Sequence, residues 1–273
     1  MSRRRAGNTP PIAVKPQARA HPPTQRSLDP AAATQSDRVA ESASGDRATL
    51  RPDDASRWGL GDAALAYIVG ILASTVALSV VVAVGAEMGT AATLAAGVAG
   101  LWVGFIGGPL VASRTRGEGR PVDEFGLRVR WSDLPSGVVC GIAAQLVVVP
   151  AVSWPLQRLL GGDVSDSARD LLGPAGAGRW LIIAVVVFGA PVAEELFFRG
   201  LLLRGFARHL SDPVAVVSSS AVFGATHFQL LQFPGLFTAG LLFATLTWRN
   251  GRLGPAIIAH AAFNATTVVV LLA

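Results

Sequence analysis

The stretch Ala190 to Phe206, which reads APVAEELFFRGLLLRGF, determines how the rest of the chain is interpreted. It places two adjacent carboxylates, Glu194 and Glu195, in a long apolar run that also contains Arg199. An ionised side chain at the centre of a membrane helix costs about 3 kcal/mol unless it is paired or solvated. The two glutamates therefore need partners or a function.

The spacing within this stretch separates the roles of the two glutamates. Residues four apart on a helix lie on one face, so Glu195 and Arg199 are expected to form an ion pair that neutralises both charges. Glu194 lies about 100° further round the helix and cannot share that pair. It must take a proton or find a partner on another helix, which makes it the leading candidate for chemistry.

The composition is typical of a polytopic membrane protein. Hydrophobic residues make up 51% of the chain and charged residues only 15%, which is far from the usual balance of a soluble domain. The single cysteine, Cys140, excludes a disulfide framework and a zinc site built from thiolates. We expect an all-α fold, a membrane helix bundle with a disordered N-terminal tail.

Seven apolar runs follow a tail, residues 1–57, that lacks apolar periodicity and is predicted to be disordered, basic and cytoplasmic. Each run approaches the length needed to cross hydrocarbon, so about seven transmembrane helices are predicted. Trp58 is expected to anchor the first helix at the membrane interface. The predicted helices are Ala63 to Ala86, Ala91 to Ala112, Leu134 to Leu156, Arg179 to Phe206, Pro213 to Phe228, Phe233 to Trp248 and Gly254 to Leu272.

Two polar segments separate some of these runs. The segment from Ser113 to Asp133 contains DEFGLRVRW, a piece that is able to lie on the bilayer as a short amphipathic element. Further on, Asp163, Asp166 and Asp170 form a cluster that either holds a cation or is a solvated helix face. Pro150 and Pro155 predict kinks in the third helix.

The distribution of arginine predicts the topology, because positive charge is kept on the cytoplasmic side. Seven helices with the N-terminus in the cytoplasm leave only Arg158, Arg169 and Arg179 outside. We therefore expect an integral protein of a bacterial-type plasma membrane, with a cytoplasmic N-terminus and an external C-terminus.

Four polar side chains on three predicted helices reach a similar depth. At a rise of about 1.5 Å per residue, Glu194 lies 15 to 20 Å from its cytoplasmic end, His227 about 20 Å and Asn264 about 15 Å. His260 lies on the same face as Asn264, one turn shallower. The four groups are therefore expected to meet near the middle of the bilayer.

Such a cluster has the chemistry for hydrolysis of an amide bond inside the membrane. The carboxylate of Glu194 is suited to take a proton from water that His227 orients, and His260 and Asn264 are suited to stabilise the oxyanion. The alternatives are structural: membrane histidines often hydrogen bond between helices, and Glu195 with Arg199 can be an ion pair without a catalytic role. A third alternative is a proton-coupled transporter, although no repeated pair of broken helices is present.

Four motifs on successive predicted helices resemble those of the CPBP family of intramembrane proteases, which includes the type II CAAX prenyl proteases and Abi-like immunity proteins. EELFFR at Glu194 to Arg199 is similar to the family's EExxxR motif, and FGATH, ending at His227, is similar to FxxxH. HAAFN, from His260 to Asn264, is similar to HxxxN. A small-residue third motif is matched by Phe237, Gly240 and Ala244, with alanine where the family often has glycine.

The resemblance covers roughly residues 123–273 and implies a protease core there, after a tail at 1–57 and two membrane helices with their loop at 58–122. It implies that Glu194 is the base, that His227 holds the water and that Glu195 and Arg199 orient the site. His260 and Asn264 would stabilise the oxyanion.

The resemblance leaves the cofactor and the partners open. Family members are often described as metalloproteases, and a glutamate with two histidines can bind zinc. The helical HExxH spacing is absent, so we expect a mechanism without a metal, with zinc as the alternative. Expected partners are the lipid bilayer and a membrane protein or lipidated peptide, and no nucleic acid is expected. The resemblance also suggests C-terminal processing of the CAAX type. A non-catalytic immunity or scaffold protein is the alternative from another class, and the partner of the tail is unknown.

Overall fold

The computed structural model describes residues 50, 52, 56–163, 165, 169 and 178–273. Residues 1–46 and 47–273 form two separate units, and every described residue belongs to the second. The described part contains helices and no strands, which confirms the all-α fold class. Most of the predicted disordered tail lies outside the described residues, and so do Asp166 and Asp170 of the aspartate cluster.

The helical elements follow one another with short connections. In the labels η2, η4 and η5 the letter marks a π-helical segment. The elements are α2 Leu60–Ala83, α3 Ala91–Phe105, α4 Gly107–Arg116, α5 Pro121–Glu124, α6 Asp133–Ala143, η2 Ala144–Val148, α7 Val149–Leu160, α9 Arg179–Ala184, η4 Val185–Gly189, α10 Ala190–Glu195, η5 Leu196–Leu202, α11 Leu203–Ala207, α12 Asp212–Ala225, α13 Phe233–Asn250 and α14 Gly254–Leu272.

Five stretches are long and apolar enough to cross a membrane, which confirms a polytopic membrane helix bundle. The predicted number of seven is not confirmed. The fifth predicted run forms only α12, whose 14 residues extend about 21 Å against a hydrocarbon core about 30 Å thick. The five stretches are Leu60–Ala83, Ala91–Arg116, Asp133–Leu160, Arg179–Ala207 and Gly254–Leu272.

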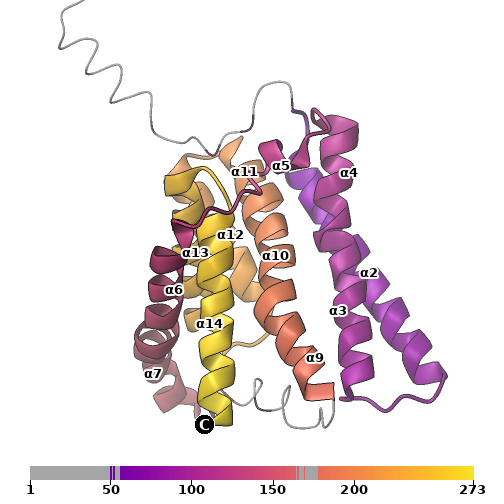
Figure 1. Cartoon of the computed structure of the whole chain (residues 1–273), viewed down its shortest axis with the longest axis vertical. Coiled ribbons are helices and arrows are strands. Elements are labelled where there is room, and N and C mark those ends of the chain that lie inside the picture. Colours follow the sequence, from indigo (N-terminus) through magenta and orange to yellow (C-terminus); the bar gives the residue numbers. More distant parts are fainter. Residues whose placement is uncertain (1–49, 51, 53–55, 164, 166–168, 170–177) are drawn as a thin grey trace, which may run out of the picture. The chain divides into compact units, whose positions relative to one another are not determined.

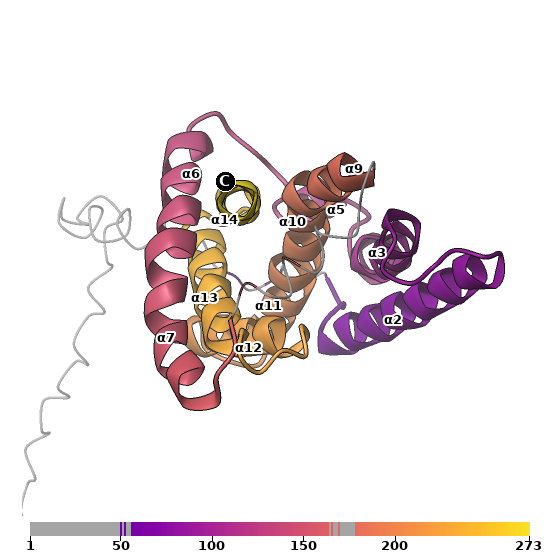
Figure 2. The ribbon, with the colours of Figure 1, turned by 90° about the horizontal axis from the view of Figure 1, so that it is seen from below.

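The helix from α9 to α11 lies in the middle of the bundle (Figures 1 and 2). The pair α2 and α3 lies on one side of it, and α14, α13 and the long helix α6 to α7 lie on the other. The C-terminus is at the opposite end of the bundle from α5 and the end of α4. The start of α2 lies at the α5 end, because the backbone N–H of Arg57 donates to the carbonyl of Arg116 over 2.6 Å.

Two of the π-helical segments end just before a proline. In a π-helix each N–H reaches the carbonyl five residues earlier, and η2 and η4 are followed by helices with Pro150 and Pro191 near their first residue. Proline has no N–H and its ring crowds the preceding turn, so the helix widens there. The kink predicted at Pro150 thus takes the form of a π turn, and the helix continues to Leu160.

Small residues let α2 and α3 approach closely. A Cβ atom added at Gly104 would lie 2.1 Å from the carbonyl oxygen of Ala66, and one added at Gly100 would lie 2.4 Å from Cα of Ser74. The hydroxyl of Ser74 also donates to the carbonyl of Gly97 over 2.8 Å. Only glycine at these positions allows the observed separation of the two helices.

Trp58 is not an interfacial anchor, which corrects the sequence prediction. Its side chain is 1% exposed, its indole N–H donates to Glu124 over 2.8 Å, and its ring packs 4.9 Å from that of Phe125. The guanidinium of Arg208 covers the other part of the ring. The loop that contains α5 folds back over the start of α2 and shields this tryptophan.

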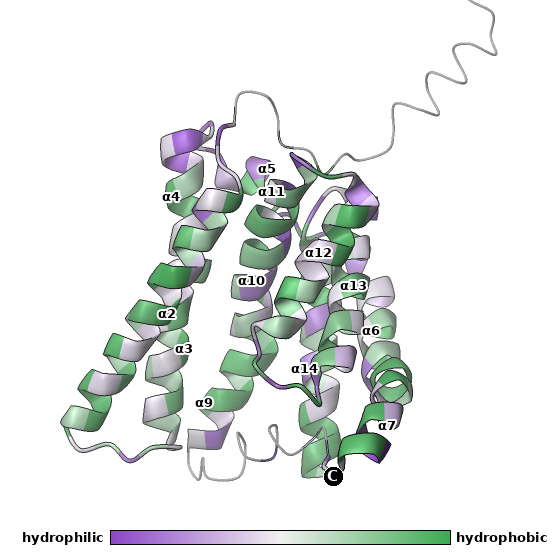
Figure 3. Ribbon diagram, turned by 180° about the vertical axis from the view of Figure 1, so that it is seen from behind, coloured by the Kyte–Doolittle hydropathy of each residue, from purple (hydrophilic) through white to green (hydrophobic). Residues whose placement is uncertain are grey.

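The predicted surface element in the Ser113 to Asp133 segment forms only the single turn α5. Its apolar residues divide between two environments, because Phe125 is fully buried whereas Val129 and Trp131 are exposed. In Figure 3 hydrophilic residues concentrate at this end of the bundle, and a hydrophilic stretch also interrupts the ribbon of α10.

Candidate active site

The glutamate pair lies at the middle of the central helix. Glu194 is the fifteenth residue after Arg179, which starts the 29-residue helix that ends at Ala207. Glu195 and Arg199 form the ion pair that their spacing predicts, with 2.8 Å between Oε1 and Nη1, and both side chains are fully buried. The charge of Glu195 is therefore neutralised from within its own helix.

Aromatic rings and a carbonyl surround the guanidinium of Arg199. Its central carbon lies 4.4 Å from the ring centre of Phe223 and 5.4 Å from that of Phe243. The second terminal nitrogen donates to the carbonyl of Gly240 over 3.2 Å. These contacts link the central helix to α12 and α13 and hold the cation without water.

His260, from α14, contacts both glutamates. Its Nδ1 lies 2.9 Å from Oε1 of Glu195, and its Nε2 lies 3.8 Å from Oε2 of Glu194. The ring stacks on Phe243 with 4.7 Å between centres. A carboxylate accepts hydrogen bonds, so Nδ1 carries the proton and Nε2 faces Glu194.

His227 lies in the turn directly after α12, and its tautomer is fixed in the same way. Its Nδ1 is 2.8 Å from the carbonyl of Phe223, which can only accept, so Nδ1 carries the proton and Nε2 of the neutral ring is an acceptor. The next residue, Phe228, has a φ of 54° and a side chain that is 83% exposed. A bulky residue in this left-handed region is strained, which is typical of functional sites.

Asn264 is held by the π turn that precedes the glutamates. Its Nδ2 donates to the carbonyl of Val186 over 2.8 Å. Val186 lies five residues before Pro191, which has no N–H to give to that carbonyl. Asn264 supplies the missing donor, and one hydrogen of its amide nitrogen remains.

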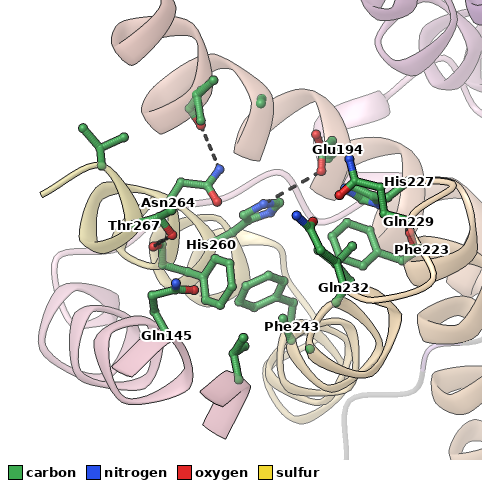
Figure 4. A pocket seen from close by; sticks show the side chains of 18 of the residues that line it. Gln145, Glu194, Phe223, His227, Gln229, Gln232, Phe243, His260, Asn264 and Thr267 are labelled. Atoms are coloured by element: carbon green, nitrogen blue, oxygen red, sulfur yellow. Dashed lines mark hydrogen bonds and ion pairs between the residues drawn. The ribbon is translucent and has the colours of Figure 1, made fainter. Parts of the chain in front are cut away.

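A cavity of about 450 Å³ brings four of the predicted residues together (Figure 4). Glu194, His227, His260 and Asn264 all line it. The side chain of Glu194 is 20% exposed to this space, whereas Glu195 and Arg199 lie behind the wall. The first four side chains therefore reach the cavity, whereas Glu195 contacts His260 from behind the wall and Arg199 pairs with Glu195.

Three glutamines of the cavity wall were not predicted as site residues. Gln229 and Gln232 follow His227 in the turn before α13, and Gln145 comes from η2. The sequence indicates Gln229 and Gln232 only weakly as site residues, because they are polar and follow the candidate residue His227 by two and five positions. Gln145 is an amide in the middle of an apolar run, which is a signal that could have found it.

The donor set does not fit a metal ion. Within the described ranges, no three histidine, cysteine, aspartate or glutamate side chains are grouped so that they could hold one. We therefore derive no step through a metal.

Comparison with protein families finds a match in the C-terminal half of the chain. Residues 176–266 match the family described as Type II CAAX prenyl endopeptidase Rce1-like. This segment contains all six predicted site residues, from Glu194 to Asn264. Comparisons with curated proteins and with solved structures found no match. The chain is therefore an integral membrane protein, and the match of residues 176–266 to a family of CAAX proteases supports an intramembrane protease in general.

Proposed function

We propose that the protein hydrolyses a peptide bond of a membrane-associated substrate with water activated by Glu194. The observation that supports this most directly is the cavity, in which Glu194 faces Nε2 of His260 across 3.8 Å and is joined by His227 and Asn264. The name of the matching family suggests a prenylated peptide as substrate and C-terminal processing as the outcome.

The first chemical step uses the two acceptors that face the cavity. A water molecule donates one hydrogen to the Glu194 carboxylate and the other to Nε2 of His227, and its oxygen attacks the carbonyl carbon of the substrate. Glu194 takes the proton as the carbon–oxygen bond forms. It then gives this proton to the leaving nitrogen as the carbon–nitrogen bond breaks.

The oxyanion of the tetrahedral intermediate needs donors from the opposite side. Asn264 has one amide hydrogen left beyond its bond to Val186. His260 carries a proton on Nδ1 towards Glu195, so it donates to the oxyanion from Nε2 when that nitrogen also carries a proton. Glu195 and Arg199 thus act as positioning residues.

We propose that these steps need no metal, and zinc is the alternative to test. Active protein purified in detergent should keep its cleavage rate after dialysis against a strong chelator. A loss of activity that added zinc restores would contradict this part of the proposal.

We also propose that the end of the bundle with α4 and α5 faces the cytoplasm, so that the C-terminus is external. It carries arginines of several connections, whereas Arg158 and Arg179 lie towards the other end. A reporter that is active only in the cytoplasm should be silent when fused after Ala273. Activity of that fusion would reverse the topology.

The substitution Glu194→Gln tests the proposed function. It keeps the size and hydrogen bonding of the side chain but removes the base, so cleavage of a prenylated CAAX peptide should fall by a factor of about 10² to 10⁴. The matched control is Glu87→Gln, on an exposed loop between α2 and α3, which should leave the rate unchanged. Melting temperatures in detergent show whether each variant is folded.

The same variant separates the protease from a scaffold. If cells that carry Glu194→Gln keep the phenotype of the wild type at normal expression, the spans serve binding only. Membrane proteomes of the two strains should instead differ by shortened or uncleaved substrates.

A further inference from the structure

The cavity has a second polar wall, on the helix that runs from α6 to α7. Two glycines on α6 bring this helix close to α14: a Cβ at Gly137 would lie 2.7 Å from the side chain of Ile258, and one at Gly141 would lie 2.2 Å from the carbonyl of Ala259. Gln145 follows Gly141 by one turn and continues the same face. The close approach of the two helices therefore carries its carboxamide to the cavity.

Gln145 is a polar group without a structural partner at membrane depth. It lies 12 residues after the start of the span Asp133–Leu160, near its middle. Its carboxamide makes no hydrogen bond within the part of the chain that the structure describes. An amide in apolar surroundings costs on the order of 1 to 3 kcal/mol when unpaired, so its presence points to a ligand.

Ser153 is a second such group on the same wall. Its side chain is fully buried, its hydroxyl has no partner among the described residues, and it lines the same cavity near Gly235 of α13. It follows Gln145 by eight residues, which corresponds to about 12 Å along a helix. Gln145 and Ser153 therefore lie about 12 Å apart along the axis of the same helix.

The backbone at Gln145 repeats the arrangement at Val186. Each residue lies in a π turn, five positions before a proline that has no N–H. At Val186 the carbonyl is bound by Asn264. At Gln145 the π turn is next to the cavity, and π-helical segments of this kind are frequent at functional sites.

We propose that Gln145 and Ser153 form a subsite that binds the main chain of the substrate peptide on the wall facing Glu194. This inference rests on the proposed function. In Figure 4 Gln145 lies on the other side of the cavity from Glu194 and His227. A peptide bound between the two walls has its scissile bond at Glu194 and its neighbouring amides at Gln145.

The chemistry of the wall selects a peptide main chain over other ligands. A carboxamide offers both a donor and an acceptor, the pair that an extended residue presents on one edge. Neither Gln145 nor Ser153 has a charge that would select an ion. An extended chain rises about 3.3 Å per residue, so the 12 Å between the two groups spans three to four residues of substrate.

Binding is measured without turnover in the full-length Glu194→Gln protein in detergent, with a fluorescent prenylated CAAX peptide. Adding Gln145→Leu should weaken binding about tenfold, the effect of one or two lost hydrogen bonds. Adding Ser153→Ala should weaken it about threefold. The matched control is Gln157→Leu, the same substitution on the same helix at a residue that does not line the cavity.

Peptides with one backbone N–H replaced by an ester oxygen identify the contact. For one position, the ester analogue should bind the Glu194→Gln protein about tenfold more weakly than the amide peptide does. In the protein that also carries Gln145→Leu, the ester and the amide peptide should bind equally. Gln145→Leu should also raise the melting temperature, because it removes an unpaired amide from apolar surroundings. A glutamine with a purely structural role would give a lower melting temperature instead.

The inference is overturned if Gln145→Leu and Gln157→Leu bind the peptide with equal affinity, or if every ester analogue loses affinity equally with and without Gln145. Cleavage by the wild type is a separate readout. If the wild type cleaves the peptide but Gln145→Leu does not change peptide binding, the subsite alone is contradicted. If Gln145→Leu weakens peptide binding but the wild type does not cleave the peptide, the proposed function is contradicted and the subsite stands.

Discussion

The pair α2 and α3 and the group from α9 to α14 are both built from apolar helices, but they bury different things. Only 11% of the apolar part of α2 is buried, against 44% of the span Arg179–Ala207. The first pair is joined by glycines, with Gly104 against Ala66. The second group buries an ion pair, a histidine and a cavity.

The difference shows what each region needs from its sequence. Two lipid-facing helices need only small residues along one line, because van der Waals packing supplies their association. The group around Glu195 buries charged atoms, so its stability depends on specific contacts, above all the ion pair with Arg199 and the contact with His260. Substitutions around Glu195 should therefore reduce both stability and cleavage, whereas substitutions between α2 and α3 should reduce stability alone.

The largest effect is expected from Arg199→Leu. It leaves the carboxylate of Glu195 buried without its counter-charge, which should cost about 3 to 5 kcal/mol of stability and abolish cleavage. Thermal unfolding in detergent measures the first effect and peptide cleavage the second. The matched control is Arg116→Leu, whose ion pair with Asp62 is exposed and should be worth less than about 1 kcal/mol. Equal losses from the two variants would remove the contrast between the regions.

A smaller effect is expected from Gly104→Ala on the other side of the comparison. The added methyl would meet the carbonyl of Ala66, so we expect a loss of about 1 to 3 kcal/mol. The folded fraction should still cleave peptide at the normal rate, because no site residue moves. Gly107→Ala is the control: a Cβ there meets nothing, and helix propensity favours alanine by up to about 1 kcal/mol. Loss of activity in folded Gly104→Ala protein would show that the two regions are coupled.

The smallest effect is expected at Glu124, where the two regions meet. Burial is the largest influence and raises the pKa of its carboxyl, but hydrogen bonds from Ser113, Trp58 and the N–H of Arg120 outweigh it and hold the pKa below the usual value of 4.5. A depressed pKa stabilises the fold above pH 4.5, and this contribution is lost as pH falls through the folded-state value.

The substitution Glu124→Gln should therefore cost about 1 kcal/mol at pH 7 and less at lower pH. The melting temperatures of wild type and variant, measured from pH 7 down to pH 3, should converge below about pH 4.5. Glu118→Gln, on the exposed loop, is the control. A gap that stays constant with pH would show that the carboxylate charge at Glu124 is not what stabilises this junction.

Much of the fold could be predicted from the sequence, because apolar length and glycine content act locally. The helix Gly254–Leu272 begins and ends where predicted, and the one from Arg179 ends one residue later than predicted. The fifth run could not be placed as well. α12 stops at Ala225, and His227 lies in a turn whose strained Phe228 no local pattern predicts.

The site was predictable in its members and less so in its contacts. Helical spacing predicts the pair of Glu195 and Arg199, because both residues belong to one helix. Nothing local indicates that His260 would bind Glu195, or that Asn264 would bind Val186 through a π turn. Such contacts depend on how helices far apart in sequence cross, and Trp58 shows the same limit.

The burial of Leu50 indicates where the helix bundle begins along the chain. This residue is fully buried among Leu203, Ala207, Val216 and Ala244, so it fills a gap beside the last turn of the helix that carries the glutamates. A protein that lacks the residues up to 46 keeps Leu50 in this gap, whereas one that lacks the residues up to 57 loses it. The boundary between the N-terminal tail and the helix bundle therefore lies several residues before residue 57, where the amino-acid composition changes.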